Sequence, residues 1–401
     1  MEDQARSGMS RREVIGSLAV LGGCASLRWF GVAHGWSRGG LEGSLSFLGA
    51  HDPVRAFVTQ RMSEYGIPGM SVATIRRSRM DMIHAGYNDV EFEIPVGPET
   101  VYQIASVSKI FAGIAVMLLV DDGELEVEAP VKDILPGIPE AWSGIRVHHL
   151  LEHTSGLPRG PEEAPGYQPE AARRRRREIF VGEDKLDLFS AEERLEFLKQ
   201  VPLANEPGTR YSYNQMGYML VGMIVARYHE ASYPSFLTAR VFRPLGMTSA
   251  RFGDSRVVVP NRRQVAYTRQ YGPFQNWLWP YSTSDYPAAG LNVSVQDLAK
   301  CLRALAEGRL LSARSRERMW TRLRLTDGTS VDYGLGWSVK EMAGRTVVGH
   351  EGGGCCWLTH VPEEEVTAIA LSNLAGSGAD DTSDRIATLV IEGAEAAEES
   401  G

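Results

Sequence analysis

Apolar and polar residues alternate along the chain with the periods of helices and strands. After the Asp52-Pro53 pair, apolar residues recur at helical spacing through about Tyr65, and Asp followed by Pro is a common way to open a helix. Two apolar runs, 69–74 and 80–85, are joined by a polar turn, which predicts two neighbouring strands. Four later runs with short connections predict antiparallel strands near 333–340, 345–350, 355–361 and 366–372.

A strongly apolar segment begins near Ser106 and ends at Gly123. Its residues are apolar on nearly every side of a helix, and a helix of that kind is buried at the centre of a fold. Further helices are expected over about 214–228, after the capping residue Ser294, and over about 378–393. We therefore expect the helix that follows Ser106 to form the centre of the hydrophobic core.

Two stretches show neither the helical nor the strand spacing of apolar residues. Residues 158–190 contain four prolines and the run Arg173–Arg177, so a long surface loop is expected. Contact of these arginines with a substrate or a membrane is the alternative to a solvated surface. Residues 260–289 are rich in Trp, Tyr and Pro, and they are interpreted either as the wall of a ligand pocket or as ordinary core.

Composition excludes several classes of protein. The 401 residues include 42 Lys and Arg against 50 Asp and Glu, a formal net charge of −8, and 43% are hydrophobic. These are values of a folded globular protein rather than a disordered or fibrous one. The acidic balance argues against general nucleic-acid binding, so no nucleic-acid partner is expected. Only six of the 42 basic residues are Lys, so a motif that contains Lys is rarely a chance occurrence here.

The N-terminal segment has the layout of an export signal. Ser10–Arg12 resembles the start of a twin-arginine signal, and a short apolar stretch of signal-peptide length follows it. Leu21–Cys24, with the sequence LGGC, resembles a bacterial lipobox. We predict that residues 1–35 are an export signal and linker, and that the protein is periplasmic or a membrane-anchored bacterial lipoprotein with its lipid on Cys24. A simple leader, cut within 25–35, is the alternative.

No metal site or disulfide framework is expected. The four cysteines include the adjacent pair Cys355-Cys356 but form no CxxC pattern, and two small thiols in a strand are a simpler interpretation than a strained vicinal disulfide. His149 and His153 have metal-ligand spacing on a helix, but no third ligand accompanies them. The prediction is therefore a protein without a metal or other cofactor.

Ser106 and Lys109 are the first candidates for chemistry. Residues i and i+3 of a helix share a face, so Lys109 is expected beside the Ser106 hydroxyl. A hydroxyl becomes nucleophilic when a neighbouring base takes its proton, and a buried Lys, whose pKa is lowered, can be that base. The alternative is an ordinary helix start with an exposed Lys. Because the helix is apolar nearly all round, an unpaired Lys would be costly there, which favours the catalytic interpretation.

Five segments occur in order along the chain, namely Val101–Phe111, Leu150–Pro158, Pro207–Tyr213, Tyr333–Trp337 and Gly349–Gly353. Together they resemble the motifs of the serine β-lactamase-like family, which includes class C β-lactamases, D-alanyl-D-alanine carboxypeptidases, D-aminopeptidases and related esterases. The resemblance extends from about residue 50 to residue 393. It implies an α/β (α+β) fold in which helices flank an antiparallel sheet and a mostly helical domain is inserted.

The same resemblance implies the domain organisation. After the export signal and linker of 1–35, a discontinuous sheet domain is expected from 50–105 and 287–395. A mostly helical domain is expected over 106–286, with the loop excursion 158–190 inside it. The active site is then expected in the cleft between the two domains.

Individual residues also match roles in that family. Ser106 matches the nucleophile that forms an acyl-enzyme, Lys109 the adjacent base, and Tyr213 the tyrosine that passes a proton to the leaving group. His350 matches the first position of the third motif. The backbone N–H groups of Ser106 and Gly353 match the oxyanion hole, which stabilises the transition state.

Two positions depart from the family's pattern. Gln215 stands where the family usually has Asn, and its extra methylene shifts the amide that positions an acyl group. Glu351 stands where members that act on β-lactams usually have Thr, which helps to hold a substrate carboxylate. An ionised Glu351 that faces the site would repel this carboxylate, so a neutral ester or amide, or an amine-bearing peptide, is the expected substrate. With Gly352 and Gly353, these two residues are the candidate substrate-binding set.

The sequence therefore predicts an exported serine hydrolase that acts through an acyl-enzyme on an ester or amide. Its expected partner is a small-molecule or peptide substrate, and its only expected membrane contact is through the candidate lipid at Cys24. One alternative is a true β-lactamase or D-alanyl-D-alanine carboxypeptidase. Another is a non-catalytic binding or scaffold protein on the same fold, which Gln215 favours. The intact Ser106, Lys109 and Tyr213 favour an enzyme.

Overall fold

The structure is a computed structural model that describes residues 46–48, 52–159, 190–253, 264–269, 274–277 and 281–399. The chain divides into two units, Met1–Gly40 and Leu41–Gly401, and every described residue belongs to the second. The predicted export signal with Cys24 and nearly all of the loop excursion 158–190 lie outside the described residues. Within the described part of the chain, no helix has the length and apolar character needed to cross a membrane.

The second unit is built on an antiparallel sheet of eight strands. The order is β1-β3-β2-β15-β14-β13-β12, and β4 pairs with β3 outside this path. The strands are β1 (Ser46–Leu48), β2 (Gly69–Arg76), β3 (Arg79–Asp89), β4 (Ile94–Pro95), β12 (Ser338–Met342), β13 (Arg345–Gly352), β14 (Cys356–Val361) and β15 (Val366–Ser372). The N-terminal and C-terminal strands join where β2 pairs with β15, in the register that places Met70 opposite Ser372.

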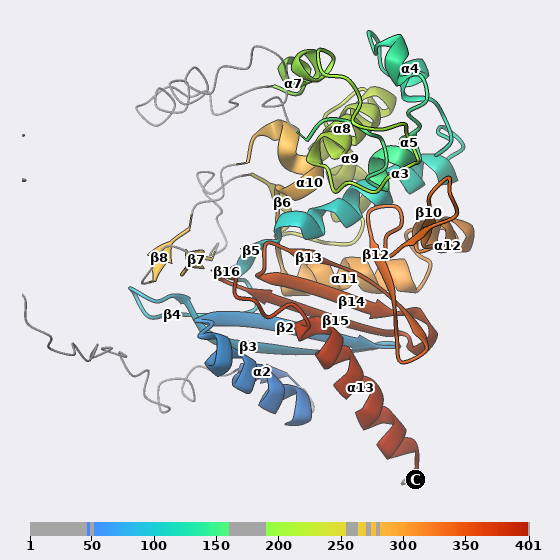
Figure 1. The fold of residues 1–401 in the computed structure, drawn as a ribbon. Coiled ribbons are helices and arrows are strands. Elements are labelled where there is room, and N and C mark those ends of the chain that lie inside the picture. The colour runs from blue at the N-terminus through green and yellow to red at the C-terminus, as the bar shows by residue number, and fades with distance from the viewer. Residues whose placement is uncertain are drawn as a thin grey trace, which may run out of the picture. The chain divides into compact units, whose positions relative to one another are not determined.

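Helices cover both faces of this sheet (Figure 1). The helices α2 (Asp52–Tyr65) and α13 (Thr382–Glu399) pack on one face, and α11 (Val295–Ala306) packs on the other. Successive strand residues point to opposite faces. In β15, accordingly, Ala368 and Ala370 belong to the core under α2 and α13, whereas Ile369 belongs to the core on the side of α11. A strand covered on both faces, such as β15, is therefore apolar at successive positions rather than at alternate ones.

The helical layer is organised around α3 (Lys109–Asp121), which is buried on all sides as the sequence predicts (Figure 1). The remaining helices are α4 (Val131–Ile134), α5 (Val147–Leu151), α7 (Ala191–Leu198), α8 (Gln215–His229), α9 (Tyr233–Leu237), α10 (Tyr286–Ala289) and α12 (Ala313–Met319). The helix α8 packs on α3, on α5 and on α10, and α12 also packs on α3. Short 3-10 or π turns are η1 (Ala105–Ser108), η2 (Glu140–Trp142), η4 (Thr238–Phe242), η5 (Thr283–Asp285) and η6 (Pro362–Glu364).

Three small sheets accompany the large one. One joins β5 (Val101–Gln103), β9 (Leu291–Ser294) and β6 (Arg251–Phe252). Another joins β16 (Leu374–Ala375), β7 (Tyr267–Thr268) and β8 (Gln275–Asn276), and a third pairs β10 (Leu323–Arg324) with β11 (Ser330–Val331). The β5–β9 pair is the one that matters for function, because η1 and α3 follow directly from β5.

The predicted fold class is confirmed, with one local correction. The strand predicted over 333–340 begins only at Ser338, because residues 333–337 form a turn against the start of α3. Gly336 has a φ of +84°, and a Cβ at this position would lie 2.8 Å from the carbonyl oxygen of Lys109. The apolar run predicts burial there correctly, but close approach to a helix excludes extended pairing. The predicted domain boundaries stay predictions.

Candidate active site

Ser106 lies at the start of the buried helix, in a position set by a short 3-10 turn. The strand β5 ends at Gln103, η1 spans Ala105–Ser108, and α3 begins at Lys109. Side chains three residues apart nearly eclipse one another in a 3-10 turn, so this geometry places Lys109 beside Ser106. Ala105 has a φ of +44°, a conformation that costs a non-glycine residue free energy.

The amino group of Lys109 is buried and contacts the Ser106 hydroxyl. Its Nζ lies 3.2 Å from Oγ of Ser106 and donates a hydrogen bond to the carbonyl oxygen of Ala288 at 2.9 Å. The rings of Tyr213 and Tyr218 lie 4.7 Å and 5.2 Å from Nζ. Lys109 forms no ion pair with any described residue. The amino group is therefore held by a backbone oxygen and two aromatic faces.

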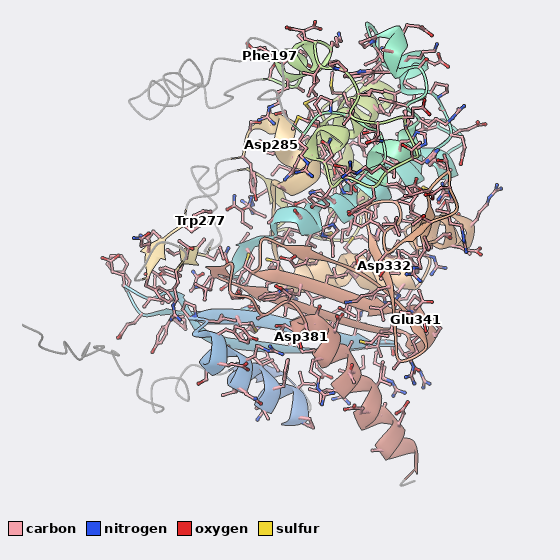
Figure 2. All side chains as sticks on the ribbon, in the orientation of Figure 1. Phe197, Trp277, Asp285, Asp332, Glu341 and Asp381 are labelled. Atoms are coloured by element: carbon pink, nitrogen blue, oxygen red, sulfur yellow. The ribbon has the colours of Figure 1, made fainter. Side chains whose placement is uncertain are left out.

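This environment prepares Lys109 to act as a base. Burial lowers its pKa from 10.5 to about 7, and the negative charge of Asp285 partly offsets this by raising it. Asp285 itself is engaged by Arg194, with N–O distances of 2.6 Å and 3.2 Å, and it lies beside α10 (Figure 2). Because the charged form is desolvated and lacks a direct counter-ion, the neutral amine is readily populated near pH 7.

Tyr213 makes the second contact to the nucleophile. Its hydroxyl donates a hydrogen bond to Oγ of Ser106 at 2.9 Å. Burial raises the pKa of Tyr213, and its hydrogen bond with Ser106 lowers it by a smaller amount. Tyr213 therefore stays protonated while the pKa of Lys109 is lowered, and such opposite shifts distinguish an acid from a base in one site.

Asn214 holds Tyr213 in place. The Asn214 side chain is buried and donates hydrogen bonds to the carbonyl oxygens of Leu157 and Pro158, at 2.7 Å and 3.1 Å. Its Oδ1 accepts a hydrogen bond from the backbone N–H of Met216 at 2.8 Å and so caps α8. Asn214 thereby joins the segment of Tyr213 to the end of the loop that follows α5.

His350 lies on β13, opposite the helical wall of the site. Its Nε2 is 2.9 Å from the Tyr333 hydroxyl, and its Nδ1 is 2.6 Å from the backbone oxygen of Glu351. Burial, followed by the positive charge of Lys109, lowers the pKa of His350 to about 3. The imidazole is therefore neutral at physiological pH, with both ring nitrogens engaged.

The residues after His350 bring the end of β13 against the nucleophile's turn. A Cβ on Gly352 would lie 2.3 Å from the carbonyl oxygen of Ile104, so only glycine allows this approach. Gly353 has a φ of +59° and lines the same cavity as Ser106, so its predicted part in the oxyanion hole stays a prediction. Glu351 is exposed at the edge of the cavity, and its Oε1 accepts a hydrogen bond from the N–H of Gly354 at 2.6 Å.

A cavity of about 460 Å³ opens over these groups. It extends from Ser106 along β13 and β14 to the start of α13. The residues that line it are Ser106, Tyr211, Tyr213, Asp332, Tyr333, Ser338, Lys340, Val347, Gly349, His350, Glu351, Gly353, Trp357, Leu358, Thr359, Asp380, Ser383 and Asp384. Gln215 is not in this set, since it is the exposed first residue of α8. Its role in positioning a substrate stays a prediction.

Sequence reasoning missed two parts of the site. The carbonyl oxygen of Ala288 holds Lys109, and a backbone acceptor leaves no signal in residue types. His153 and Tyr333 form a hydrogen-bonded group behind His350, although both stand inside the motifs quoted from the sequence. Trp277, Tyr281 and Tyr286, from the aromatic stretch 260–289, do not line the cavity.

The histidine spacing that suggested a metal does not persist in three dimensions. The helix α5 ends at Leu151, and His153 follows it with a φ of +59°, so His149 and His153 do not share a helical face. In the ranges that the structure describes, no group of three or more His, Cys, Asp or Glu residues is arranged to hold a metal ion.

Comparison with known proteins identifies the family of the chain. Residues 54–392 match the model of the Beta-lactamase family. Penicillin-binding protein 4* of Bacillus subtilis (strain 168) is 27% identical over 280 residues, which cover 67% of this chain and 59% of that protein. A D-aminopeptidase of Gluconobacter oxydans (strain 621H) is 26% identical over 329 residues, which cover 80% of this chain and 58% of that protein. The chain thus spans less than two thirds of the length of these curated relatives.

Solved structures share the fold. The octameric penicillin-binding protein homologue from Pyrococcus abyssi has a TM-score of 0.66 and 27% identity, and the match covers 81% of this chain and 73% of that one. The D-amino acid amidase from Ochrobactrum anthropi SV3 has a TM-score of 0.68 and 22% identity, and the match covers 85% of this chain and 100% of that one. The family match covers most of the chain, and the chain therefore belongs to the Beta-lactamase family of serine hydrolases and their relatives.

Proposed function

We propose that the protein is a hydrolase that forms an acyl-enzyme on Ser106. The observation that supports this most directly is the pair of contacts to Oγ of Ser106, 3.2 Å from Nζ of Lys109 and 2.9 Å from the Tyr213 hydroxyl. A serine with a base on one side and an acid on the other has the arrangement that nucleophilic catalysis requires. The depressed pKa of Lys109 and the raised pKa of Tyr213 are consistent with these roles.

In the proposed reaction, neutral Lys109 accepts the Ser106 proton as Oγ attacks the carbonyl carbon of the substrate. The carbonyl oxygen becomes an oxyanion, which the N–H groups of Ser106 and Gly353 stabilise. Tyr213 donates its proton to the leaving amine or alcohol and regains one from the Lys109 ammonium. Water then attacks the acyl carbonyl carbon while Lys109 accepts a proton from it, the ester bond to Oγ breaks, Lys109 returns that proton to Oγ of Ser106, and the free acid departs.

We further propose that the preferred substrate is an ester or amide that bears an amine near the reacting carbonyl. Four carboxylates line the cavity, and two of them are compensated, Asp384 by Lys340 and Asp332 by Arg322. Glu351 and Asp380 form no ion pair with a described residue. An excess of negative charge repels a substrate carboxylate and attracts an ammonium group. This argues against the β-lactamase and D-alanyl-D-alanine carboxypeptidase alternatives.

Labelling with a fluorophosphonate probe tests the catalytic proposal. We expect a covalent adduct on Ser106, located by mass spectrometry of peptides, and no adduct at that position in Ser106→Ala. An unlabelled but folded parent protein would support the non-catalytic alternative instead.

A matched substrate pair tests the proposed substrate class. A D-amino-acid p-nitroanilide with a free amine is compared with its N-acetylated form, a short-chain p-nitrophenyl ester and a chromogenic cephalosporin. We expect kcat/KM to be highest for the free amine at low ionic strength and to fall as salt screens the carboxylates. Preferential turnover of the cephalosporin would contradict this substrate class.

We also propose export, on the sequence of residues 1–35 alone. Cell fractionation of a tagged chain is expected to recover it outside the cytoplasm, and replacing Arg11 and Arg12 with Lys is expected to retain it inside. Metabolic labelling with a radioactive fatty acid, which Cys24→Ser should abolish, separates the lipoprotein from a simply cleaved leader.

A further inference from the structure

Four side-chain contacts form an unbroken line across the back of the site. Nδ1 of His153 is 2.9 Å from the backbone N–H nitrogen of Asn214, and Nε2 of His153 is 3.3 Å from the Tyr333 hydroxyl. The same hydroxyl is 2.9 Å from Nε2 of His350, whose Nδ1 is 2.6 Å from the backbone oxygen of Glu351. The line begins one residue after Tyr213 and ends two residues before Gly353. It therefore connects the segments of the proposed acid and the proposed oxyanion hole.

The first end of the line fixes the tautomer of His153. A backbone N–H can only donate, so Nδ1 of His153 must accept and bears no hydrogen. The single proton of a neutral His153 is then on Nε2, from which it is donated to the oxygen of Tyr333. His153 is buried, and burial lowers its pKa well below the usual value, so the neutral form is the one present.

The other end fixes the tautomer of His350 in the opposite sense. A backbone carbonyl can only accept, so Nδ1 of His350 bears the hydrogen. Its Nε2 then has a free lone pair, which accepts the hydrogen of the Tyr333 hydroxyl. Tyr333 thus accepts one hydrogen bond and donates one, and every donor in the line meets an acceptor.

From this polarity we propose that His153, Tyr333 and His350 form a directed bridge that holds the two sides of the active site at a fixed separation. Tyr333 is the positioning residue at its centre, because it is the only member that contacts both histidines. His350 acts as a positioning residue as well, since both of its nitrogens are occupied and neither is free for a substrate proton. The proposal rests on the proposed function of Ser106, Lys109 and Tyr213.

Protonation of His350 would reverse the polarity of this bridge. A hydrogen on Nε2 would be donated to the oxygen of Tyr333, whose own hydrogen would then have to turn from His350 to the hydroxyl of Tyr218. The ionisable groups that face His350 are Lys109 on α3, Tyr213 before α8 and Tyr333 before β12, with Glu351 beside it on β13. Lys109 opposes protonation of His350, whereas the backbone oxygen of Glu351 favours it. The bridge therefore adds to burial in keeping the imidazole neutral.

Selective ¹⁵N-histidine labelling and long-range NMR correlation test the tautomers without any assay of activity. Signals are assigned with His153→Gln and His350→Gln. We expect the proton on Nε2 for His153 and on Nδ1 for His350, with both rings neutral down to about pH 5. The same tautomer in both residues, or a doubly protonated His350 at pH 5.5, would overturn the proposal, while fluorophosphonate labelling of Ser106 reports separately on the proposed function.

Tyr333→Phe tests the consequence for the reaction. We expect kcat to fall about tenfold with little change in KM, because substrate contacts remain while the two sides lose their fixed separation. The pKa of His350 is also expected to rise in this variant, as followed by the same ¹⁵N signals, since Nε2 then has no donor to exclude a second proton. Tyr211→Phe is the matched control, because it removes a tyrosine hydroxyl from the same cavity but keeps the ring that packs on Tyr333 and all four contacts of the bridge, and it should leave the pKa of His350 unchanged. An unchanged pKa of His350 in folded Tyr333→Phe would contradict the inference.

Discussion

The two walls of the cavity hold their functional groups in different ways. On the helical wall, Ser106, Lys109 and Tyr213 touch one another directly, and burial moves the pKa values of the last two in opposite directions. On the strand wall, His350 is neutral and tied at both nitrogens, and Glu351 is exposed. The difference indicates that proton transfer belongs to the helical wall, whereas geometry and substrate preference belong to the strand wall.

Removing the base from the helical wall should have the largest effect. Lys109→Met keeps the length of the side chain but leaves Ser106 without a proton acceptor. We expect kcat to fall on the order of 10³-fold or more, because an unactivated hydroxyl is a poor nucleophile. Steady-state kinetics measure this, with circular dichroism as the check on folding. Activity within about tenfold of the parent would assign proton transfer to another group.

Moving the strand wall without changing its chemistry should have the next largest effect. In Gly352→Ala the new Cβ meets the carbonyl oxygen of Ile104, which would be 2.3 Å away, so β13 must shift from the nucleophile's turn. A displacement of about 1 Å costs on the order of 100-fold in rate, and we expect a loss of kcat/KM of that size. The control is Gly97→Ala, because a Cβ there has nothing within 4 Å. Equal activity of the two variants would show that the close approach has no catalytic importance.

The pH dependence separates the two walls. Lys109 must be neutral to accept a proton and its pKa is about 7, so kcat/KM should fall about tenfold for each pH unit below 7. His350 stays neutral far below that range and should add no titration of its own. Rates measured from pH 5 to pH 9 check this. A profile that falls as pH rises through 7 would contradict the role of Lys109 as the base.

A smaller effect is expected when only the charge of the strand wall changes. Glu351→Gln retains an oxygen for the N–H of Gly354 but removes the negative charge. An exposed charge pair contributes about 1 kcal/mol, so the preference for the free-amine anilide over its N-acetylated form should fall about fivefold. The preference should also become less sensitive to salt. An unchanged preference would exclude Glu351 from substrate recognition.

The smallest effect is expected at the position where the sequence departs from its family. Gln215 is exposed at the first turn of α8 and outside the residues that line the cavity. Gln215→Asn should therefore leave kcat and KM within about twofold of the parent. A large gain in activity would show that residue 215 reaches the substrate during turnover.

These contrasts also explain what could be predicted from the sequence. The contact between Ser106 and Lys109 follows from local geometry, and Tyr213 follows from the family's motif. The acceptor at Ala288 is a backbone atom 179 positions from Lys109, and no residue pattern encodes it. The apolar neighbours of Tyr333 predict a strand, but Gly334 and Gly336 let the chain turn against α3. Packing between segments far apart in the sequence determines both the Ala288 contact and the turn at Tyr333, and such packing cannot be derived from a single sequence.

The pairing of β2 with β15 also governs how the chain reaches its folded state. The backbone N–H of Gly69 donates a hydrogen bond to the side chain of Asn373, although 304 positions separate the two residues. The centre of the sheet therefore depends on the closure of one very long loop. Until β15 has been synthesised, β2 is an unpaired apolar edge strand of the β2–β3 hairpin, and such an edge promotes aggregation. A nascent chain stalled before Val366 should therefore need a chaperone to remain in solution, whereas the finished chain covers that edge with β15.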